Sequence, residues 1–92
     1  MKIVIIEDEQ HTAEDLAETI KKAESGAQIG AILRSVKEAV AYFQNNERPD
    51  LIFCDIQLGD GLSFEIFNRI PISSPVIFCT AYDEYALKAF KA

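Results

Sequence analysis

Apolar and polar residues along this chain follow two alternating patterns. Residues 2–6 are a run rich in Ile and Val that stops at two acids, which is typical of a strand buried on both faces of a parallel sheet. Apolar residues then recur at the spacing of one helical face, at Ala13, Leu16, Ala17 and Ile20. Ser25 and Gly26 end this helix. The start of the chain therefore predicts a strand followed by a helix.

The same pair of patterns returns in the middle of the chain. Residues 27–33 predict a second strand, and Ser35 is a suitable N-cap for the helix that follows. The apolar residues on one face of that helix are Val36, Ala39, Val40 and Phe43. Residues 51–54 predict a third buried strand, which again ends at an acid, Asp55.

The last third of the chain completes the pattern. Turn-forming residues 59–61 precede a third helical stripe. Its apolar members are Leu62, Ile66, Phe67 and Ile70. Pro75 opens a fourth strand over residues 76–79, and residues 84–91 have a helical pattern. Strict alternation with short connections predicts a single α/β domain with a parallel sheet and helices on both faces, of flavodoxin-like or Rossmann-like architecture.

Charge and composition narrow the possible functions. The 92 residues carry a formal net charge of −6, which disfavours nucleic-acid binding because Lys and Arg supply most of that affinity. The apolar run near the start is too short for a signal peptide, and no run approaches the length of a membrane span. We therefore expect a cytoplasmic domain without direct contact to nucleic acid or membrane. Cys54 and Cys79 should be buried, reduced thiols that lie close together on neighbouring strands.

Polar side chains gather where the predicted strands end. Glu7 and Asp8 follow the first strand, Asp55 follows the third and Thr80 the fourth. Ligands of open parallel sheets bind beyond the carboxyl ends of the strands, so these residues should share one crevice. Converging carboxylates repel one another, and a hard divalent cation with oxygen ligands relieves that repulsion. Mg²⁺ is the expected cation.

Asp55 has the central position for nucleophilic chemistry. A carboxylate can attack phosphorus to form an aspartyl phosphate, a reaction that needs mainly alignment and charge neutralisation. In the alternative interpretation, Glu7 and Asp8 only favour the positive end of the first helix. Asp50 and Asp55 would then be ordinary loop acids. The coincidence of acids and Thr80 at strand ends favours the phosphoryl-transfer site.

These residues resemble the receiver domains of bacterial two-component response regulators, over essentially the whole chain. The acidic pair Glu7-Asp8 looks like the family's metal pair, Asp55 like its phosphorylation site, and Thr80-Ala81 like its switch hydroxyl and the residue after it. The resemblance implies that Asp55 accepts a phosphoryl group from a sensor histidine kinase. Thr80 would hydrogen-bond that group, with the backbone of Ala81 beside it.

The same resemblance implies the ligands of the cation. Asp8 and Asp55 would bind Mg²⁺ directly, and the backbone carbonyl of Gln57 would be a third protein ligand. Glu7 would act largely through water. The implied fold is flavodoxin-like, with strand order 2-1-3-4-5.

Residues 55–67 and 80–90 are similar to receivers that precede LytTR-type DNA-binding output domains, so we expect a role in transcription regulation. Gly59 stands where many family members have Pro. Residues 1–92 would be a receiver domain truncated before the family's fifth strand and last helix. The fourth strand would then be a bare edge, which predicts self-association of the fragment.

Two other functions use a similar site or fold. A haloacid-dehalogenase-like phosphatase also has an Asp nucleophile and Mg²⁺, but it needs a second acid two positions later, where this chain has Gln57. A pseudo-receiver would be an interaction module without phosphorylation, which the complete set of acids with Thr80 disfavours. The expectation is therefore a phosphoacceptor signalling domain rather than an enzyme with turnover.

Overall fold

The computed structural model describes residues 1–78 of the chain. Its strands and helices are β1 (Lys2–Ile6), α1 (Gln10–Ala23), β2 (Gln28–Leu33), α2 (Val36–Asn45), β3 (Leu51–Cys54), β4 (Gln57–Leu58), β5 (Gly61–Leu62), α3 (Phe64–Arg69) and β6 (Val76–Phe78). The predicted helix at residues 84–91 lies outside the described residues, as do Cys79, Thr80 and Ala81.

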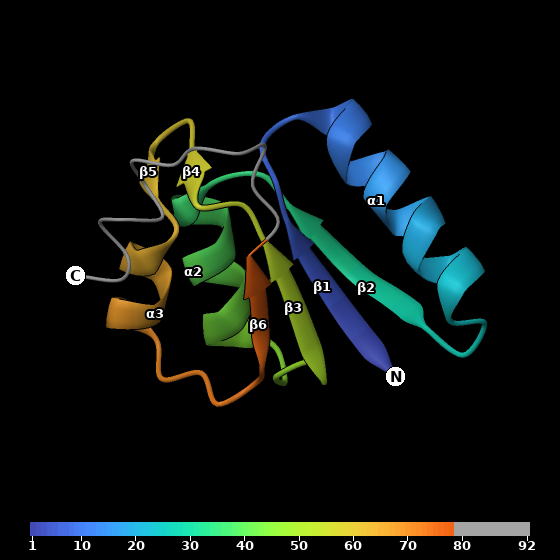
Figure 1. Cartoon of the computed structure of the whole chain (residues 1–92). Coiled ribbons are helices and arrows are strands. Elements are labelled where there is room, and N and C mark those ends of the chain that lie inside the picture. Colours follow the sequence, from blue (N-terminus) through green and yellow to red (C-terminus); the bar gives the residue numbers. More distant parts are fainter. Residues whose placement is uncertain (79–92) are drawn as a thin grey trace.

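Four of the strands form one parallel sheet in the order β2-β1-β3-β6 (Figure 1). Because β1 lies between β2 and β3, the order is flavodoxin-like rather than Rossmann-like, and it confirms the predicted order 2-1-3-4. Ile6, the last residue of β1, lies opposite Leu33 of β2 and Cys54 of β3. The three strands therefore end together at one edge of the sheet.

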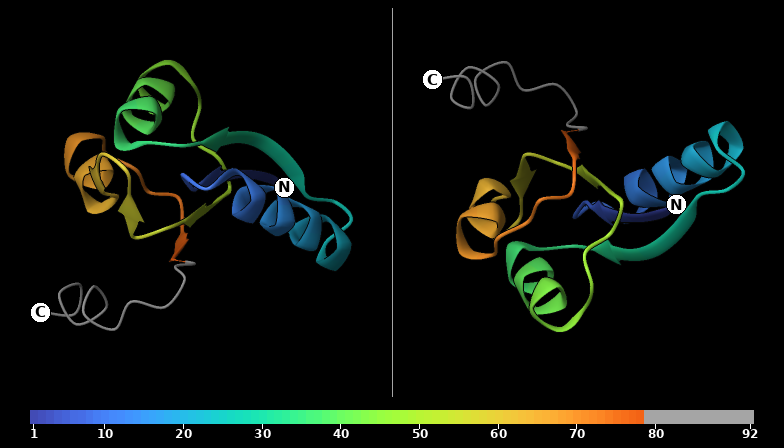
Figure 2. Two further views of the ribbon diagram at one scale, coloured as in Figure 1. Left: turned by 90° about the horizontal axis from the view of Figure 1, so that it is seen from above. Right: turned by 90° about the horizontal axis from the view of Figure 1, so that it is seen from below.

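Helices cover both faces of this sheet, with α1 on one face and α2 on the other (Figure 2). Alternate residues of β1 serve the two faces, as the two-residue period of a strand requires. Ile3 and Ile5 pack with Ala13 and Ile20 of α1. On the opposite face, the buried cluster contains Val4, Ile6, Val36, Ala39, Phe43, Ile52 and Ile66, with members from β1, α2, β3 and α3. This double coverage explains why β1 reads as a continuous apolar run.

Helices α1 and α2 begin at side-chain caps. Ser35 is the N-cap of α2, as predicted, and its Oγ accepts a hydrogen bond from the backbone N–H of Glu38 at 2.9 Å. The N-cap of α1 is Glu9, which the sequence pattern did not indicate. Its carboxylate accepts hydrogen bonds from the backbone N–H groups of His11 and Thr12. None of the described helices is both long and apolar enough to cross a membrane.

The start of the third helix corrects one prediction. Leu62 was expected on the apolar stripe of that helix, but it lies in β5, where it pairs with Gln57 of β4 in a short antiparallel hairpin. Its side chain is 43% exposed. Gly61 has φ +146°, a backbone conformation that favours glycine, so the chain turns here instead of entering a helix. The helix begins only at Phe64.

Candidate metal and phosphorylation site

Backbone hydrogen bonds align the acids that follow the central strands. The N–H of Asp55 donates to the carbonyl of Ile6 at 2.9 Å, and the N–H of Glu7 donates to the carbonyl of Leu33 at 2.9 Å. Each acid is thus held by the strand next to its own. The parallel register brings Glu7, Asp8 and Asp55 to the same sheet edge, as the sequence predicts.

The three acids form a compact cluster at that edge. One carboxylate oxygen from each of Glu7, Asp8 and Asp55 lies within 4.8 Å of the other two. Glu7 is only 6% exposed, whereas Asp8 and Asp55 are half-buried. Oδ1 of Asp55 is buried and accepts no hydrogen bond from any residue in the described part of the chain. A buried carboxylate oxygen without a donor needs a compensating partner.

Burial and the neighbouring carboxylates raise the pKa of Glu7. The pKa rises from 4.5 to about 7, and the largest cause is burial, which removes water from the carboxylate. A hydrogen bond with the side chain of Asp8 and the charges of Asp55 and Asp8 raise the pKa further. The backbone N–H of Glu9, which donates to Oε2 of Glu7 at 3.0 Å, acts in the opposite direction. Ionising Glu7 in the folded protein is therefore unfavourable, chiefly because of its burial.

The residues present fit a hard divalent cation. Carboxylate oxygens are the ligands that such ions prefer, and Mg²⁺ typically takes one or two protein carboxylates and keeps several waters. The unpartnered Oδ1 of Asp55 and the raised pKa of Glu7 are both features that a cation would compensate. Glu7, Asp8 and Asp55 could hold it.

A cavity of about 190 Å³ lies beside the cluster. Its lining residues are Glu7, Gln10, Ala13, Glu14, Ile32 and Arg34. Among the described residues of this lining, Arg34 alone is positively charged, and it follows β2 at the same sheet edge as Glu7. Glu7 therefore borders both the acidic cluster and this cavity.

The family model of the response regulator receiver domain matches residues 3–92 of the sequence. The chain belongs to this family.

Relatives of this receiver domain are response regulators. It is 38% identical over 93 residues to an uncharacterized response regulatory protein of Yersinia pestis, an alignment that covers 99% of this chain and 38% of that protein. It is 34% identical over 94 residues to the sensory transduction protein LytT of Bacillus anthracis, covering 99% of this chain and 37% of LytT. This receiver domain thus spans less than half the length of both relatives.

Solved structures agree with the fold. The crystal structure of the response regulator PhyR from Brucella abortus superimposes with a TM-score of 0.75 at 34% identity, covering 88% of this chain and 33% of that one.

Not every predicted site residue of the receiver domain belongs to the acidic cluster. Gln57 lies two residues after Asp55, in β4, with an exposed side chain. Thr80 and Ala81 lie outside the described residues, so their roles stay predictions. The sequence patterns also give no indication of the contacts of Asp60, in the turn between β4 and β5, whose carboxylate accepts hydrogen bonds from the backbone N–H groups of Val36 and Lys37. The residues Gly59 to Gly61 signal a turn, but nothing local indicates that the Asp60 carboxylate contacts a distant helix.

Proposed function

We propose that this receiver domain accepts a phosphoryl group on Asp55 from a sensor histidine kinase. The observation that carries the proposal is the meeting of three strand-end carboxylates within 4.8 Å, one of which has a buried oxygen without a donor in the described residues. Ordinary loop acids do not benefit from such crowding, because each carboxylate raises the cost of ionising the others. A divalent cation and a phosphoryl group would use these features.

Mg²⁺ is the cation that we propose for this site. Asp8 and Asp55 would bind it directly, the backbone carbonyl of Gln57 would be a third protein ligand, and Glu7 would act through water. When bound, the ion neutralises charge on the carboxylates and on the oxygens of the transferred group. Its preference for few protein ligands leaves positions open for a phosphoryl oxygen.

Asp55 is the proposed nucleophile. A carboxylate oxygen of Asp55 attacks the phosphorus atom of a phosphohistidine on the kinase. An O–P bond forms while the P–N bond breaks, and its electron pair returns to the imidazole nitrogen. The hydroxyl of Thr80 would donate a hydrogen bond to a phosphoryl oxygen, with the backbone of Ala81 beside it.

We further propose that the signal passes to a DNA-binding output domain of the LytTR type. The similarity to LytT, named a sensory transduction protein, supports this assignment. The receiver domain itself carries a net charge of −6 and would not contact DNA. Its phosphorylation would instead switch the output domain and thereby transcription.

A phosphorylation assay tests the proposal. The full-length protein is incubated with Mg²⁺ and acetyl phosphate, and its intact mass is measured. One phosphoryl group per molecule, stable to acid and labile to base, is the expected result. Continuous release of inorganic phosphate from other substrates would indicate a phosphatase. An unchanged mass would indicate an interaction module without phosphorylation.

A further inference from the structure

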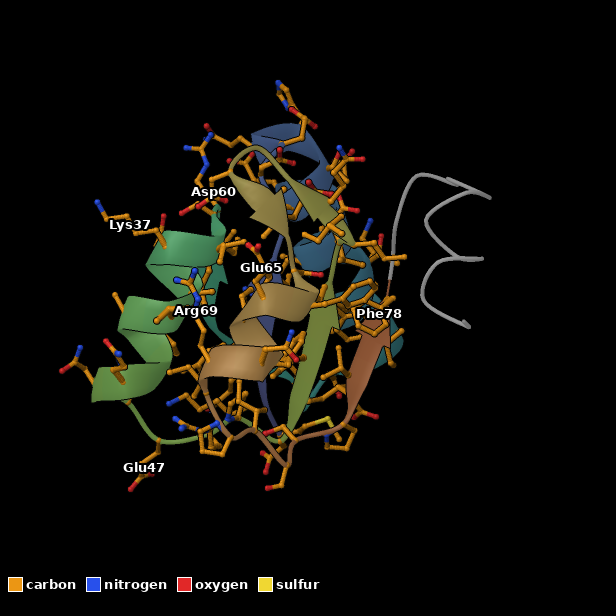
Figure 3. All side chains as sticks on the ribbon, turned by 90° about the vertical axis from the view of Figure 1, so that its left-hand side faces the viewer. Lys37, Glu47, Asp60, Glu65, Arg69 and Phe78 are labelled. Carbon is orange, nitrogen blue, oxygen red and sulfur yellow. The ribbon has the colours of Figure 1, made fainter. Side chains whose placement is uncertain are left out.

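The carboxylate of Asp60 joins the β4–β5 hairpin, residues 57–62, to the start of α2. Oδ1 accepts a hydrogen bond from the backbone N–H of Val36 at 2.8 Å, and Oδ2 accepts one from the backbone N–H of Lys37 at 3.1 Å. Figure 3 shows Asp60 next to the first turn of α2, with Lys37 pointing away from it. These two amides are among those that the first turn of a helix leaves without an internal partner. They also lower the pKa of Asp60.

Helix α2 already has a cap of its own. Ser35 satisfies the amide of Glu38, so Asp60 and Ser35 divide the free amides of the first turn between them. The two capping residues differ in their distance along the chain from α2. Ser35 precedes α2 directly and forms a local bond, whereas Asp60 comes from 24 positions beyond Val36. Only the bonds of Asp60 fix the position of another segment.

The hairpin is held at its base as well as at its turn. The backbone N–H and the hydroxyl of Ser63 both donate to the carbonyl of Ile56, at 2.8 and 3.1 Å. Ser63 and Ile56 are buried. At the turn, a Cβ on Gly61 would lie 2.7 Å from Oε2 of Glu65, so the chain passes close to α3. Leu58 of the hairpin packs in the core cluster that includes Val36 of α2. Asp60 adds the hydrogen-bonded connection to α2 at the turn, while Ser63 ties the end of the hairpin to Ile56.

The turn of this hairpin also lies against the acidic cluster. A Cβ built on Gly59 would be 3.7 Å from Oδ2 of Asp8, which is ordinary van der Waals contact. Gly59 is the direct neighbour of Asp60. Gln57, whose carbonyl is a proposed ligand of the cation, lies in the same hairpin, two residues after Asp55. Moving the turn would change the surroundings of Asp8 and the position of Gln57 together.

We propose that Asp60 is a positioning residue of the metal site, which acts by holding the β4–β5 hairpin against the N-terminus of α2. The inference rests on the proposed function, because it assigns Asp60 a role toward the Mg²⁺ that Asp8 and Asp55 would bind. Through Asp60, the cation site and the start of α2 would be energetically coupled. By reciprocity, binding of Mg²⁺ should strengthen the bonds of Asp60 to Val36 and Lys37.

Matched variants of the two caps test this proposal in the full-length protein. Asp60→Ala removes the hydrogen bonds between the hairpin and the start of α2. Ser35→Ala removes a cap from the same end of α2 but leaves the hairpin unchanged. Calorimetric titration with Mg²⁺ should give a Kd roughly tenfold higher for Asp60→Ala, the size of effect that residues supporting metal ligands have. Ser35→Ala should leave the Kd within about twofold of wild type. Asp60→Asn, which keeps the acceptor oxygen and loses the charge, should lie between wild type and Asp60→Ala.

A second measurement uses the unmodified protein and needs no variant to fold. Saturating Mg²⁺ should slow hydrogen exchange of the Val36 and Lys37 amides more than that of Glu38, which Ser35 serves. Equal Mg²⁺ affinities in Asp60→Ala and Ser35→Ala, or equal protection of the three amides, would overturn the inference. If wild-type protein is labelled at Asp55 while these differences are missing, only the role of Asp60 fails. If wild-type protein neither binds Mg²⁺ nor is labelled, the proposed function fails and the inference with it.

Discussion

The backbone N–H of Asp55 donates a hydrogen bond to the carbonyl of Ile6 at 2.9 Å, so the proposed phosphoacceptor is fixed to the last residue of the neighbouring strand. Ile6 is also the residue before the pair Glu7 and Asp8. A single parallel register therefore brings all three carboxylates together. The site depends on the two central strands of the sheet, of which β1 is buried on both faces and β3 buries Ile52 and Cys54.

The first prediction concerns the pH dependence of stability through Glu7. Its pKa in the folded protein, about 7, exceeds the ordinary 4.5, so folding favours the protonated form. This contribution to the free energy of unfolding is complete below pH 4.5 and is lost as the pH rises through about 7. Glu7→Gln resembles the protonated form. Without divalent cations it should be more stable than wild type at pH 8, by about 1–3 kcal/mol.

Urea unfolding followed by circular dichroism at pH 5 and pH 8 measures this difference. The advantage of Glu7→Gln should shrink at pH 5, and Mg²⁺ at pH 8 should stabilise the wild type more than the variant. Asp15→Asn, which removes an exposed carboxylate from α1, is the matched control. A Glu7→Gln variant with no more stability than wild type at pH 8 would contradict the expected cost of ionising the buried Glu7.

The second prediction concerns the cap of α1. The pKa of Glu9 is lowered, chiefly by the hydrogen bond from the Thr12 side chain and then by the amides of Thr12 and His11. A lowered pKa contributes stability above the ordinary value and loses it as the pH falls through the folded value. Glu9→Ala should therefore reduce the melting temperature at pH 7 and have little effect at pH 3. Melting curves of both proteins across this range test the point, and a constant difference would contradict it.

The third prediction compares two apolar side chains in different surroundings. Ile52 in β3 is fully buried, whereas Leu62 in β5 is 43% exposed. Ile52→Ala should lower the free energy of unfolding by about 2–5 kcal/mol, because it leaves a cavity in the core. Leu62→Ala should lower it by less than about 1 kcal/mol. Comparable losses of unfolding free energy in urea titrations would mean that the Leu62 side chain is buried, as the helical pattern of the sequence predicts.

The sheet and the place of the acids follow from sequence patterns because their causes are local. Both faces of β1 are covered, so its residues form an unbroken apolar run, and the first polar residues, Glu7 and Asp8, mark where the strand ends. The same reasoning locates Asp55 after β3. Parallel pairing then requires these acids to meet, which the structure confirms.

The hairpin could not be derived in this way because its causes are not local. The spacing of Leu62, Ile66 and Ile70 also fits a helix, and what decides is the turn at Gly61. The contact of Asp60 with α2 joins residues 24 positions apart, for which a single sequence contains no signal. The metal ligation by Gln57 likewise remains a prediction.

The most direct test of the central claim is phosphorylation of matched variants at the two ends of β3. Asp55 follows this strand, and the loop acid Asp50 precedes it. Full-length wild type, Asp55→Asn and Asp50→Asn are incubated with acetyl phosphate and Mg²⁺, then analysed by intact mass and peptide mapping. We expect one phosphoryl group on wild type and on Asp50→Asn, located at Asp55, and none on Asp55→Asn. Full labelling of Asp55→Asn at another residue would contradict it.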